Sequence, residues 1–270
     1  MASQSSKSRP DLASFVGLAL AVFGIVGGLV LEKGSIMDIA QTTAAIIVCC
    51  GTAGAVLVTS PMSSIRSSFS YLKTVFFERP MDVSAQLEEI MAYATKARKQ
   101  GLVSLEVETA KISDPFLRKA MDLAVDGADI DELKEMMEVE IEQREMHAEE
   151  AAKVFESGGG YSPTIGIIGA VLGLIQVMKN LANISEVGHG IAVAFVATVY
   201  GVALANLFLL PAAGKIRARA AAESKIRELS LEGVIGIIEG WNPKLIRAKL
   251  EGYLASDGKK KRSSQERAAA

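Results

Sequence analysis

The stretch that decides the fold is YSPTIGIIGAVLGLIQVM at residues 161–178, which contains no Asp, Glu, Lys, Arg or His. Three more runs are equally free of charge, at residues 12–31, 39–60 and 190–214. A helix needs about 20 apolar residues to cross the roughly 30 Å hydrocarbon core of a bilayer. The pattern therefore predicts an all-α, polytopic membrane protein with four transmembrane helices in two hairpins.

The positively charged residues indicate the orientation of these spans. The short loops at 32–38 and 179–189 hold one Lys each, whereas residues 60–160 hold twelve Lys and Arg and the chain from Lys215 onward holds thirteen. Such residues concentrate on the cytoplasmic side of a membrane. The long loop and both termini are therefore predicted to be cytoplasmic. Residues 12–31 exceed the apolar core of a secretory signal, so we expect them to remain as a helix.

The charge balance differs between the soluble segments. Residues 60–160 carry twenty acidic and twelve basic residues, and the chain from Lys215 onward carries thirteen basic and seven acidic ones. An acidic loop argues against nucleic acid as a partner, and a basic tail suits the surface of an anionic lipid membrane. The adjacent Cys49 and Cys50 cannot set up a disulfide framework.

The segment between the hairpins has helical periodicity and no strand pattern. One helix is expected over 81–100 up to Gly101, another from Asp114-Pro115, and a long one over 130–157 that Gly158-Gly159-Gly160 ends. Asn242-Pro243 is expected to begin a short last helix. The sequence therefore predicts five segments: a cytoplasmic N-terminal tail at 1–11, transmembrane hairpin 1 at 12–60, a cytoplasmic helical domain at 61–160, transmembrane hairpin 2 at 161–214, and cytoplasmic C-terminal helices with a basic tail at 215–270.

The sequence contains little evidence of a catalytic or metal-binding site. His147 and His189 lack a partner at metal-ligand spacing, and Asp126, Asp129 and Asp131 lack the spacing of a calcium loop. No catalytic, metal or cofactor site is predicted, and the chain is not expected to be an enzyme.

Small and helix-breaking residues stand out within the spans. Pairs of glycines four residues apart permit close helix approach. Pro163 and Pro211 each free a backbone carbonyl and weaken the helix near one end of a span, although they could equally just mark the span ends. The glycine pairs are Gly24 with Gly28 and Gly169 with Gly173.

Longer motifs in the second hairpin resemble the flagellar stator A subunits, the MotA family. They are SPTIGIIGAVLGL at 162–174, GIAVAFVATVYG at 190–201 and NLFLLP at 206–211, and the similarity runs from about Asp11 to Leu254 with NPKLI at 242–246. The relatives ExbB and TolQ have one span before their cytoplasmic region, whereas this chain has two. An ExbB/TolQ-like energiser and a gliding-type motor nevertheless remain alternatives.

No residue inside the four runs can carry a proton through the membrane, so an ion-binding carboxylate must come from a partner. The resemblance implies a MotB-type single-span subunit that carries this Asp, surrounded by a pentameric ring of A subunits in the bacterial inner membrane. It places Thr198 near that Asp and makes Pro163 and Pro211 the points where protonation becomes movement. Ala170 stands where sodium-type relatives carry Thr, which implies protons rather than sodium as the coupling ion.

The resemblance also implies a rotor contact. The segment RKQGLVSLE at 98–106 resembles the stretch of MotA that faces the rotor protein FliG. Arg98 and Glu106, and more weakly Lys99, are therefore expected to engage charged groups of the rotor. In this interpretation the chain couples proton flow to torque on the rotor.

Overall fold

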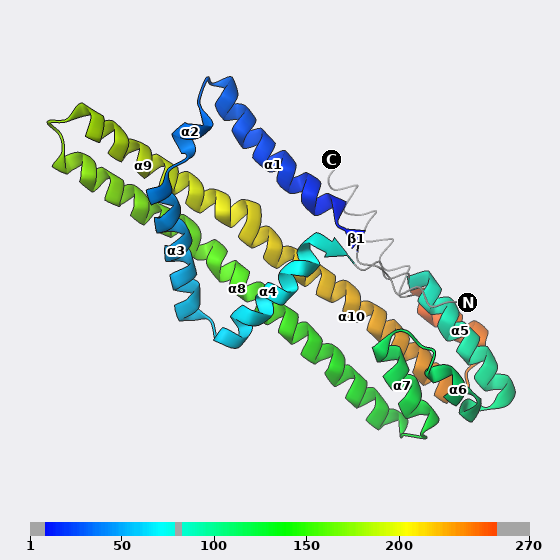
Figure 1. Cartoon of the computed structure of the whole chain (residues 1–270). Coiled ribbons are helices and arrows are strands. Elements are labelled where there is room, and N and C mark those ends of the chain that lie inside the picture. The colour runs from blue at the N-terminus through cyan, green and yellow to red at the C-terminus, as the bar shows by residue number, and fades with distance from the viewer. Residues whose placement is uncertain (1–8, 79–82, 253–270) are drawn as a thin grey trace. The chain divides into compact units, whose positions relative to one another are not determined.

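A computed structural model describes residues 9–78 and 83–252 of the 270-residue chain (Figure 1). Within these ranges the chain is helical apart from one pair of two-residue strands. It divides into two compact units. Among the described residues, the span unit comprises 9–78 and 146–219, and the loop unit comprises 83–145 and 220–252. The long helices α8 and α10 contribute to both units.

The span unit holds the apolar parts of four helices that are long and apolar enough to cross a membrane. The predicted fold class, an all-helical protein with four membrane helices, is confirmed. The elements are α1 Leu12–Leu31, α2 Ile36–Ile39, α3 Thr42–Thr59, α4 Met62–Phe76, α8 Ile130–Lys179, α9 Ile184–Ala203, the π-helical segment η2 Leu204–Leu209, and α10 Leu210–Ile238.

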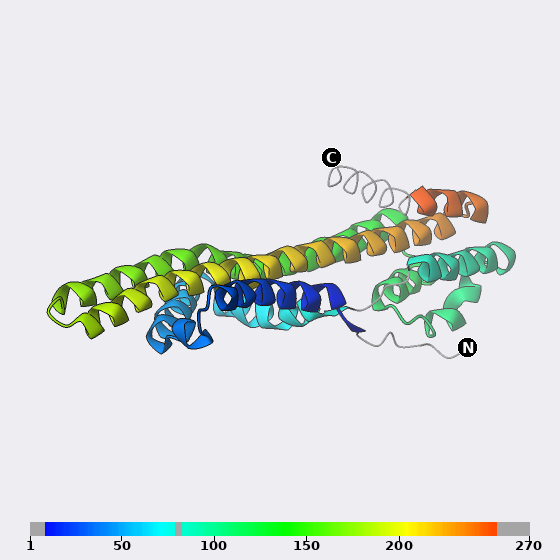
Figure 2. The ribbon, with the colours of Figure 1, turned by 90° about the horizontal axis from the view of Figure 1, so that it is seen from above.

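Helix α1 buries none of its twenty residues within the chain, although nearly all of them are apolar. A helix that is apolar on every side needs lipid or partner chains around it, because water would meet its whole surface. Helix α3 packs against α9, and α8 and α9 run side by side (Figures 1 and 2). The spans therefore leave apolar surface for contacts outside the single chain.

The predicted end of a helix at Gly158-Gly159-Gly160 is wrong, because α8 runs without a break from Ile130 to Lys179. Two of these glycines, Gly158 and Gly159, instead make room for leucines at the end of η2 and the start of α10, whereas Gly160 faces no neighbour among the described residues. A Cβ atom on Gly159 would lie 2.5 Å from Cδ2 of Leu210, and one on Gly158 would lie 3.4 Å from Cδ1 of Leu209. Close packing at these positions outweighs the low helix propensity of glycine.

The structure also contains a short strand pair that the sequence did not predict. Strand β1 (Arg9–Pro10) pairs antiparallel with β2 (Phe77–Glu78), with Arg9 opposite Glu78. Two residues are too few to display the alternation by which a strand is recognised. The pair holds the start of α1 beside the end of α4, where the backbone N–H of Asp11 donates to the carbonyl of Phe76 at 2.8 Å.

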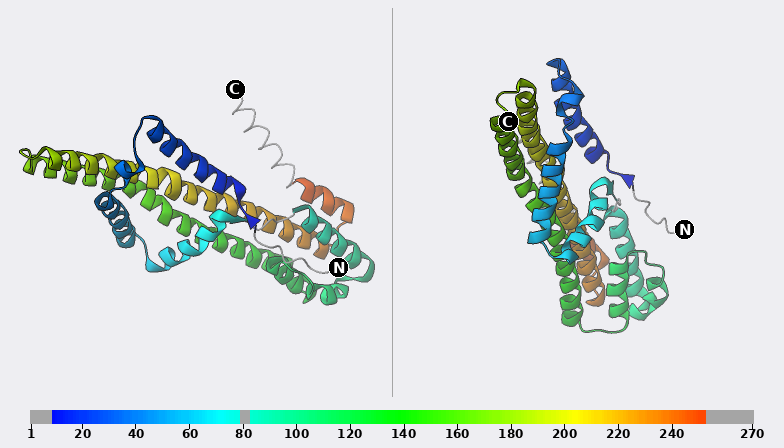
Figure 3. Two further views of the ribbon diagram at one scale, coloured as in Figure 1. Left: turned by 45° about the horizontal axis from the view of Figure 1, so that its top comes forward. Right: turned by 60° about the vertical axis from the view of Figure 1, so that its left-hand side comes forward.

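The loop unit is a helical domain with its own hydrophobic core. Helices α5, α6 and α7 form one cluster in it (Figure 3). Its elements are α5 Val83–Gln100, the 3₁₀ segment η1 Leu102–Leu105, α6 Glu106–Thr109, α7 Pro115–Val125, the first part of α8, the last part of α10, and a helix at 243–252. The fully buried members of the core include Ile90, Phe116, Leu117, Met121, Leu133, Met137, Leu229, Ile246 and Leu250.

Several local signals in this unit are confirmed. The side chain of Asp114 accepts the backbone N–H groups of Phe116 and Leu117 at the start of α7. Asn242 accepts the N–H of Lys244 at 3.1 Å before the last helix. Gly101 separates α5 from η1 with φ of +83°, a conformation that residues with a Cβ rarely adopt.

Candidate functional site

The second hairpin is held together by direct contact of two helix backbones. A Cβ atom on Gly201 of α9 would lie 2.6 Å from the carbonyl oxygen of Ser162 on α8, and one on Gly166 would lie 2.8 Å from the carbonyl oxygen of Ala197. The hydroxyl of Ser162, fully buried, donates to the carbonyl of Gly201 at 2.9 Å. Any larger side chain at either glycine would force α8 and α9 apart.

The glycine pair predicted in the third span takes part in this packing. A Cβ atom on Gly169 would lie 2.7 Å from that of Ala197, and one on Gly173 would lie 2.7 Å from the carbonyl oxygen of Gly190. The other predicted pair, Gly24 with Gly28, has nothing within 4 Å of either position. Close approach is thus confirmed for the second hairpin, whereas Gly24 and Gly28 of α1 make no such contact with the described part of the chain.

The structure brings Thr198 and Ala170 to this same helix pair. The Cα atom of Thr198 lies 3.4 Å from the position of a Cβ on Gly166, and Ala170 follows Gly166 by one turn of α8. The hydroxyl of Thr198 donates to the carbonyl of Ala194 at 3.2 Å, and both Thr198 and Ala170 are half-buried. Neither residue can bind or release a proton near neutral pH.

The two prolines lie at one level of the α8–α9–α10 arrangement. Gly159, one turn before Pro163, contacts Leu210, the direct neighbour of Pro211. Pro163 lies inside α8 without ending it, whereas a π-helical segment, η2, directly precedes α10 and Pro211. A proline removes a backbone donor, and π-helical turns are typical of places where such a disturbance is absorbed.

Pro211 also lines a cavity of about 290 Å³ in the span unit. Its walls come from α1, the end of α4 and the η2 segment, and the rings of Phe76 and Phe208 stack there with centroids 6.4 Å apart. Lys215 lies at the same cavity. The helix around Pro211 is therefore not tightly packed on the side of the first span.

A buried carboxylate ties the first span to α10. Asp11 is 6% exposed and accepts from Lys215 Nζ at 2.5 Å, from an Arg219 guanidinium nitrogen at 2.7 Å and from the Ser14 hydroxyl at 2.9 Å. The hydrogen bond from Lys215 is the main reason why the pKa of Asp11 falls to about 2. Arg219 also donates to the carbonyl oxygens of Thr74 and Phe77.

We call Asp11, Ser14, Lys215 and Arg219 the Asp11 cluster. Sequence reasoning missed it, since only the position of Asp11 directly before an apolar helix, typical of an N-cap, pointed to a role. The carboxylate does cap α1, where it accepts the N–H of Ala13 at 3.1 Å. The cluster joins α1, the end of α4 and α10 in one polar contact.

A second polar contact lies along α8 and α10. The Arg217 guanidinium donates to both carboxylate oxygens of Glu149, at 2.7 and 2.8 Å, and to Glu156 at 2.5 Å. These bonds lower the pKa of both carboxyl groups and raise that of Arg217. Arginine forms such two-pronged pairs with carboxylates readily, because its donors lie in one plane.

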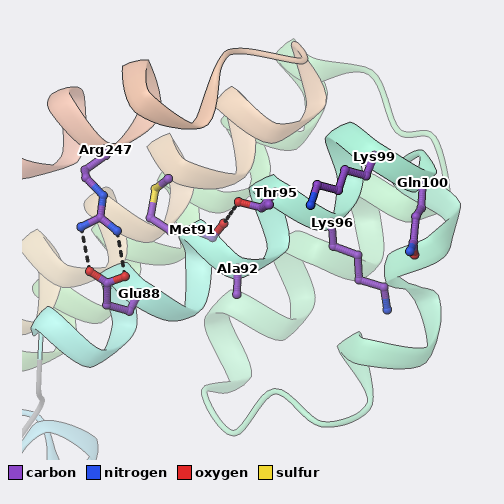
Figure 4. Close-up of a pocket in the computed structure, with 8 residues that line it drawn as sticks. All are labelled: Glu88, Met91, Ala92, Thr95, Lys96, Lys99, Gln100 and Arg247. Carbon is purple, nitrogen blue, oxygen red and sulfur yellow. Dashed lines mark hydrogen bonds and ion pairs between the residues drawn. The ribbon is translucent and has the colours of Figure 1, made fainter.

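In the loop unit, Arg98, Lys99 and Glu106 are all exposed. Arg98 and Lys99 lie in the last turn of α5, and Glu106 is the first residue of α6. Lys99 lines an open groove of about 520 Å³ with Glu88, Lys96 and Arg247, whereas Arg98 and Glu106 do not (Figure 4). Within residues 9–78 and 83–252, no three His, Cys, Asp or Glu side chains could hold a metal ion.

Known proteins resemble this chain over almost its whole length. The Motility protein A of Bacillus subtilis (strain 168) is 32% identical over 256 residues, which cover 94% of this chain and 95% of that protein. The Motility protein A of Helicobacter pylori (strain ATCC 700392 / 26695) is 34% identical over 251 residues, covering 93% and 98%. The chain belongs to the MotA family of flagellar stator subunits. Proteins of this family are channel and stator subunits, not enzymes.

Sequence profiles and a solved structure agree with this assignment. The MotA/TolQ/ExbB proton channel family matches residues 108–229, and the N-terminal region of motility protein A matches residues 15–101. The structure of C. jejuni MotAB superposes with a TM-score of 0.86 at 33% identity, covering 90% of this chain and 95% of that one. As a MotA-family protein, the chain is a multi-pass membrane protein of an ion-channel family.

Proposed function

We propose that this MotA-family chain is the A subunit of a flagellar stator, and that it couples proton flow across the bacterial inner membrane to torque on the rotor. One observation carries the proposal. The spans contain no Asp, Glu, Lys, Arg or His, yet the chain belongs to an ion-channel family. An ion-binding carboxylate must then be supplied from outside the chain.

A MotB-type subunit with a single span that carries an Asp would supply this carboxylate. The solved relative is a MotAB complex, which supports such a pairing. A ring of five copies of this chain would surround the partner, with α8 and α9 facing inward. Apolar faces that are exposed in the single chain, such as Ile168, Val171 and Ile175 on α8, then meet lipid or neighbouring copies.

Protons rather than sodium are the proposed coupling ion. Sodium requires several oxygen ligands. The side chain of Ala170 offers none on α8, and the hydroxyl of Thr198 on α9 is a single oxygen, which falls short of the several that sodium requires. A partner carboxylate that only gains and loses a proton needs no such ligand set.

Movement would start at the prolines. A protonation step at the partner Asp changes the charge facing α9, and the weakened helix around Pro211 is where α10 can shift relative to α9. The η2 segment and the adjacent cavity support this role, because both leave room for a rearrangement. The long loop and both termini would be cytoplasmic, so that α8 and α10 carry the movement toward the rotor.

Rotor contact is assigned to Arg98, Lys99 and Glu106, which would engage charged groups of FliG. All three are exposed, and none forms an ion pair with another residue at 9–78 or 83–252. Their charges are therefore available to a partner.

Two experiments test the proposal. Co-expression with a single-span, peptidoglycan-binding neighbour should yield a complex that restores swimming to a strain without stators. Pro163→Ala and Pro211→Ala should abolish rotation while the complex still purifies. Normal swimming with both variants would overturn the proposed coupling role, and a complex with an energiser of outer-membrane transport would favour the ExbB/TolQ-like alternative.

A further inference from the structure

The loop unit carries an open groove between α5 and the helix at 243–252 (Figure 4). Three of its lining residues are cations, Lys96, Lys99 and Arg247, and one is a carboxylate, Glu88. Lys96 and Lys99 lie about one turn apart on α5. The groove thus presents a row of positive charges from two segments that are far apart in the sequence.

Glu88 forms an ion pair with one of these cations, Arg247. Its two carboxylate oxygens accept from the two terminal nitrogens of Arg247, each at 2.7 Å, and the hydrogen bonds from Arg247 lower the pKa of Glu88. Both side chains are well exposed, at 63% for Glu88 and 39% for Arg247. Exposed ion pairs of this kind are weak, so an incoming carboxylate can compete for the guanidinium.

The other two cations differ in their availability. Lys96 donates to Glu108 at 2.8 Å, whereas Lys99 has no ion pair with any residue in the described ranges. Glu108 does not line the groove. Arg247 also lies 3.9 Å from a carboxylate oxygen of Glu251. A ligand entering the groove therefore meets the ammonium group of Lys99, one ammonium group that is shared with Glu108, and one guanidinium held mainly by Glu88.

The chemistry of the groove favours an acidic protein segment. No aromatic side chain is among the described lining residues, so a nucleotide base would find no stacking partner. Arg247 pairs with Glu88, which lies eleven residues before Lys99 on α5, so the two cations stand roughly 16 Å apart along the groove and an extended segment with several carboxylates could contact both. Two cations on separate elements suit two carboxylates of one segment better than they suit a single small anion.

We propose that this groove binds an acidic segment of a partner protein, with Glu88 acting as a built-in competitor that holds Arg247 until the segment arrives. If the proposed function is correct, that partner is the rotor, and the groove adds Arg247 and Glu88 to the torque surface. The groove is distinct from Arg98 and Glu106, which do not line it.

The test uses the full chain, co-purified with its B subunit and placed in zwitterionic nanodiscs. Binding of a fluorescein-labelled peptide of ten glutamates is followed by fluorescence anisotropy at low salt. A single exposed ion pair contributes about 0.2–1 kcal/mol to a binding free energy. Gaining or losing one such pair therefore changes Kd by roughly 1.4- to 5-fold. Glu88→Gln should tighten binding by about threefold, and Arg247→Gln and Lys99→Gln should each weaken it by a similar factor.

Matched controls separate the groove from the general charge of the unit. Glu138→Gln and Arg144→Gln make the same changes in net charge at exposed ion pairs outside the groove, and they should leave Kd within a factor of 1.5. Equal effects of Glu88→Gln and Glu138→Gln would overturn the proposal. It would also be overturned if the groove variants altered binding to phosphatidylglycerol vesicles and not to the peptide.

The outcome is separable from that of the proposed function. A complex that drives rotation but whose groove variants bind the peptide as the unaltered chain does would refute the groove alone. Selective peptide binding by a complex that never supports rotation would instead refute the stator function and leave the groove as a site for an acidic segment.

Discussion

The substitution Asp11→Asn removes one charge from the Asp11 cluster and keeps the helix cap, because Asn caps helices about as well as Asp. The carboxyl is 6% exposed, and its pKa falls from 3.8 to about 2 next to Lys215 and Arg219. A shift of this size corresponds to about 2 kcal/mol of stability near neutral pH. We therefore expect the variant to lose about 2 kcal/mol, or roughly 4–8 °C in the melting temperature of a unit this large.

The pH dependence gives the sharper test. A carboxyl whose folded pKa is depressed stabilises the protein above its unfolded pKa, and this stability is lost as the pH falls through the folded value. The difference in stability between the unaltered chain and Asp11→Asn should have its full size at pH 6, and it should decline as the pH falls from about 4 to about 2. Thermal unfolding of the detergent-solubilised chain, followed by circular dichroism over this range, measures it.

Asp38→Asn serves as the control. Asp38 lies in the first turn of α2, where its exposed carboxylate accepts the N–H of Ser35 at 2.7 Å, and it has no ion pair within the described part of the chain. Its replacement should shift the melting temperature by less than about 2 °C. Equal losses for the two variants, or a loss at Asp11 that does not change with pH, would refute the electrostatic account of the cluster.

Three further outcomes are expected. Gly201→Ala places a methyl group 2.6 Å from a backbone oxygen of α8 and should cost about 1–3 kcal/mol in thermal unfolding, whereas Gly24→Ala, with nothing within 4 Å, should be nearly neutral. Arg98→Glu and Glu106→Lys should each lower torque in a tethered-cell assay without reducing the amount of chain in the membrane, and normal torque in both would count against them as rotor contacts. Ala170→Thr adds a hydroxyl to the third span and should make swimming speed respond to sodium, and a speed that ignores sodium would show that this position does not select the ion.

The spans could be located from the sequence because the signal is local. The predicted run at residues 12–31 has the same bounds as α1, since uninterrupted apolar composition is sufficient to mark a membrane helix. The predicted break at Gly158–Gly160 failed because glycine propensity is also local, whereas the contact of Gly159 with Leu210 joins two helices about fifty residues apart. Local rules find elements, and tertiary packing decides where some of them end.

The candidate site shows the same division. Gly169 and Gly173 were predicted to pack closely because their spacing is visible along one helix, and the structure confirms it. The Asp11 cluster could not be predicted, since Arg219 is 208 residues away and no pattern along the chain links them. The pairing of Glu88 with Arg247 spans 159 residues and was equally invisible.

The dependence of motor rotation on its ion source tests the central claim most directly. A strain whose only stator contains this chain and its B subunit is tethered by a flagellar filament, and rotation is recorded while sodium is removed and then while a protonophore is added. The account predicts that rotation continues without sodium and stops when the protonophore collapses the proton gradient. Rotation that stops without sodium and persists with the protonophore would contradict it.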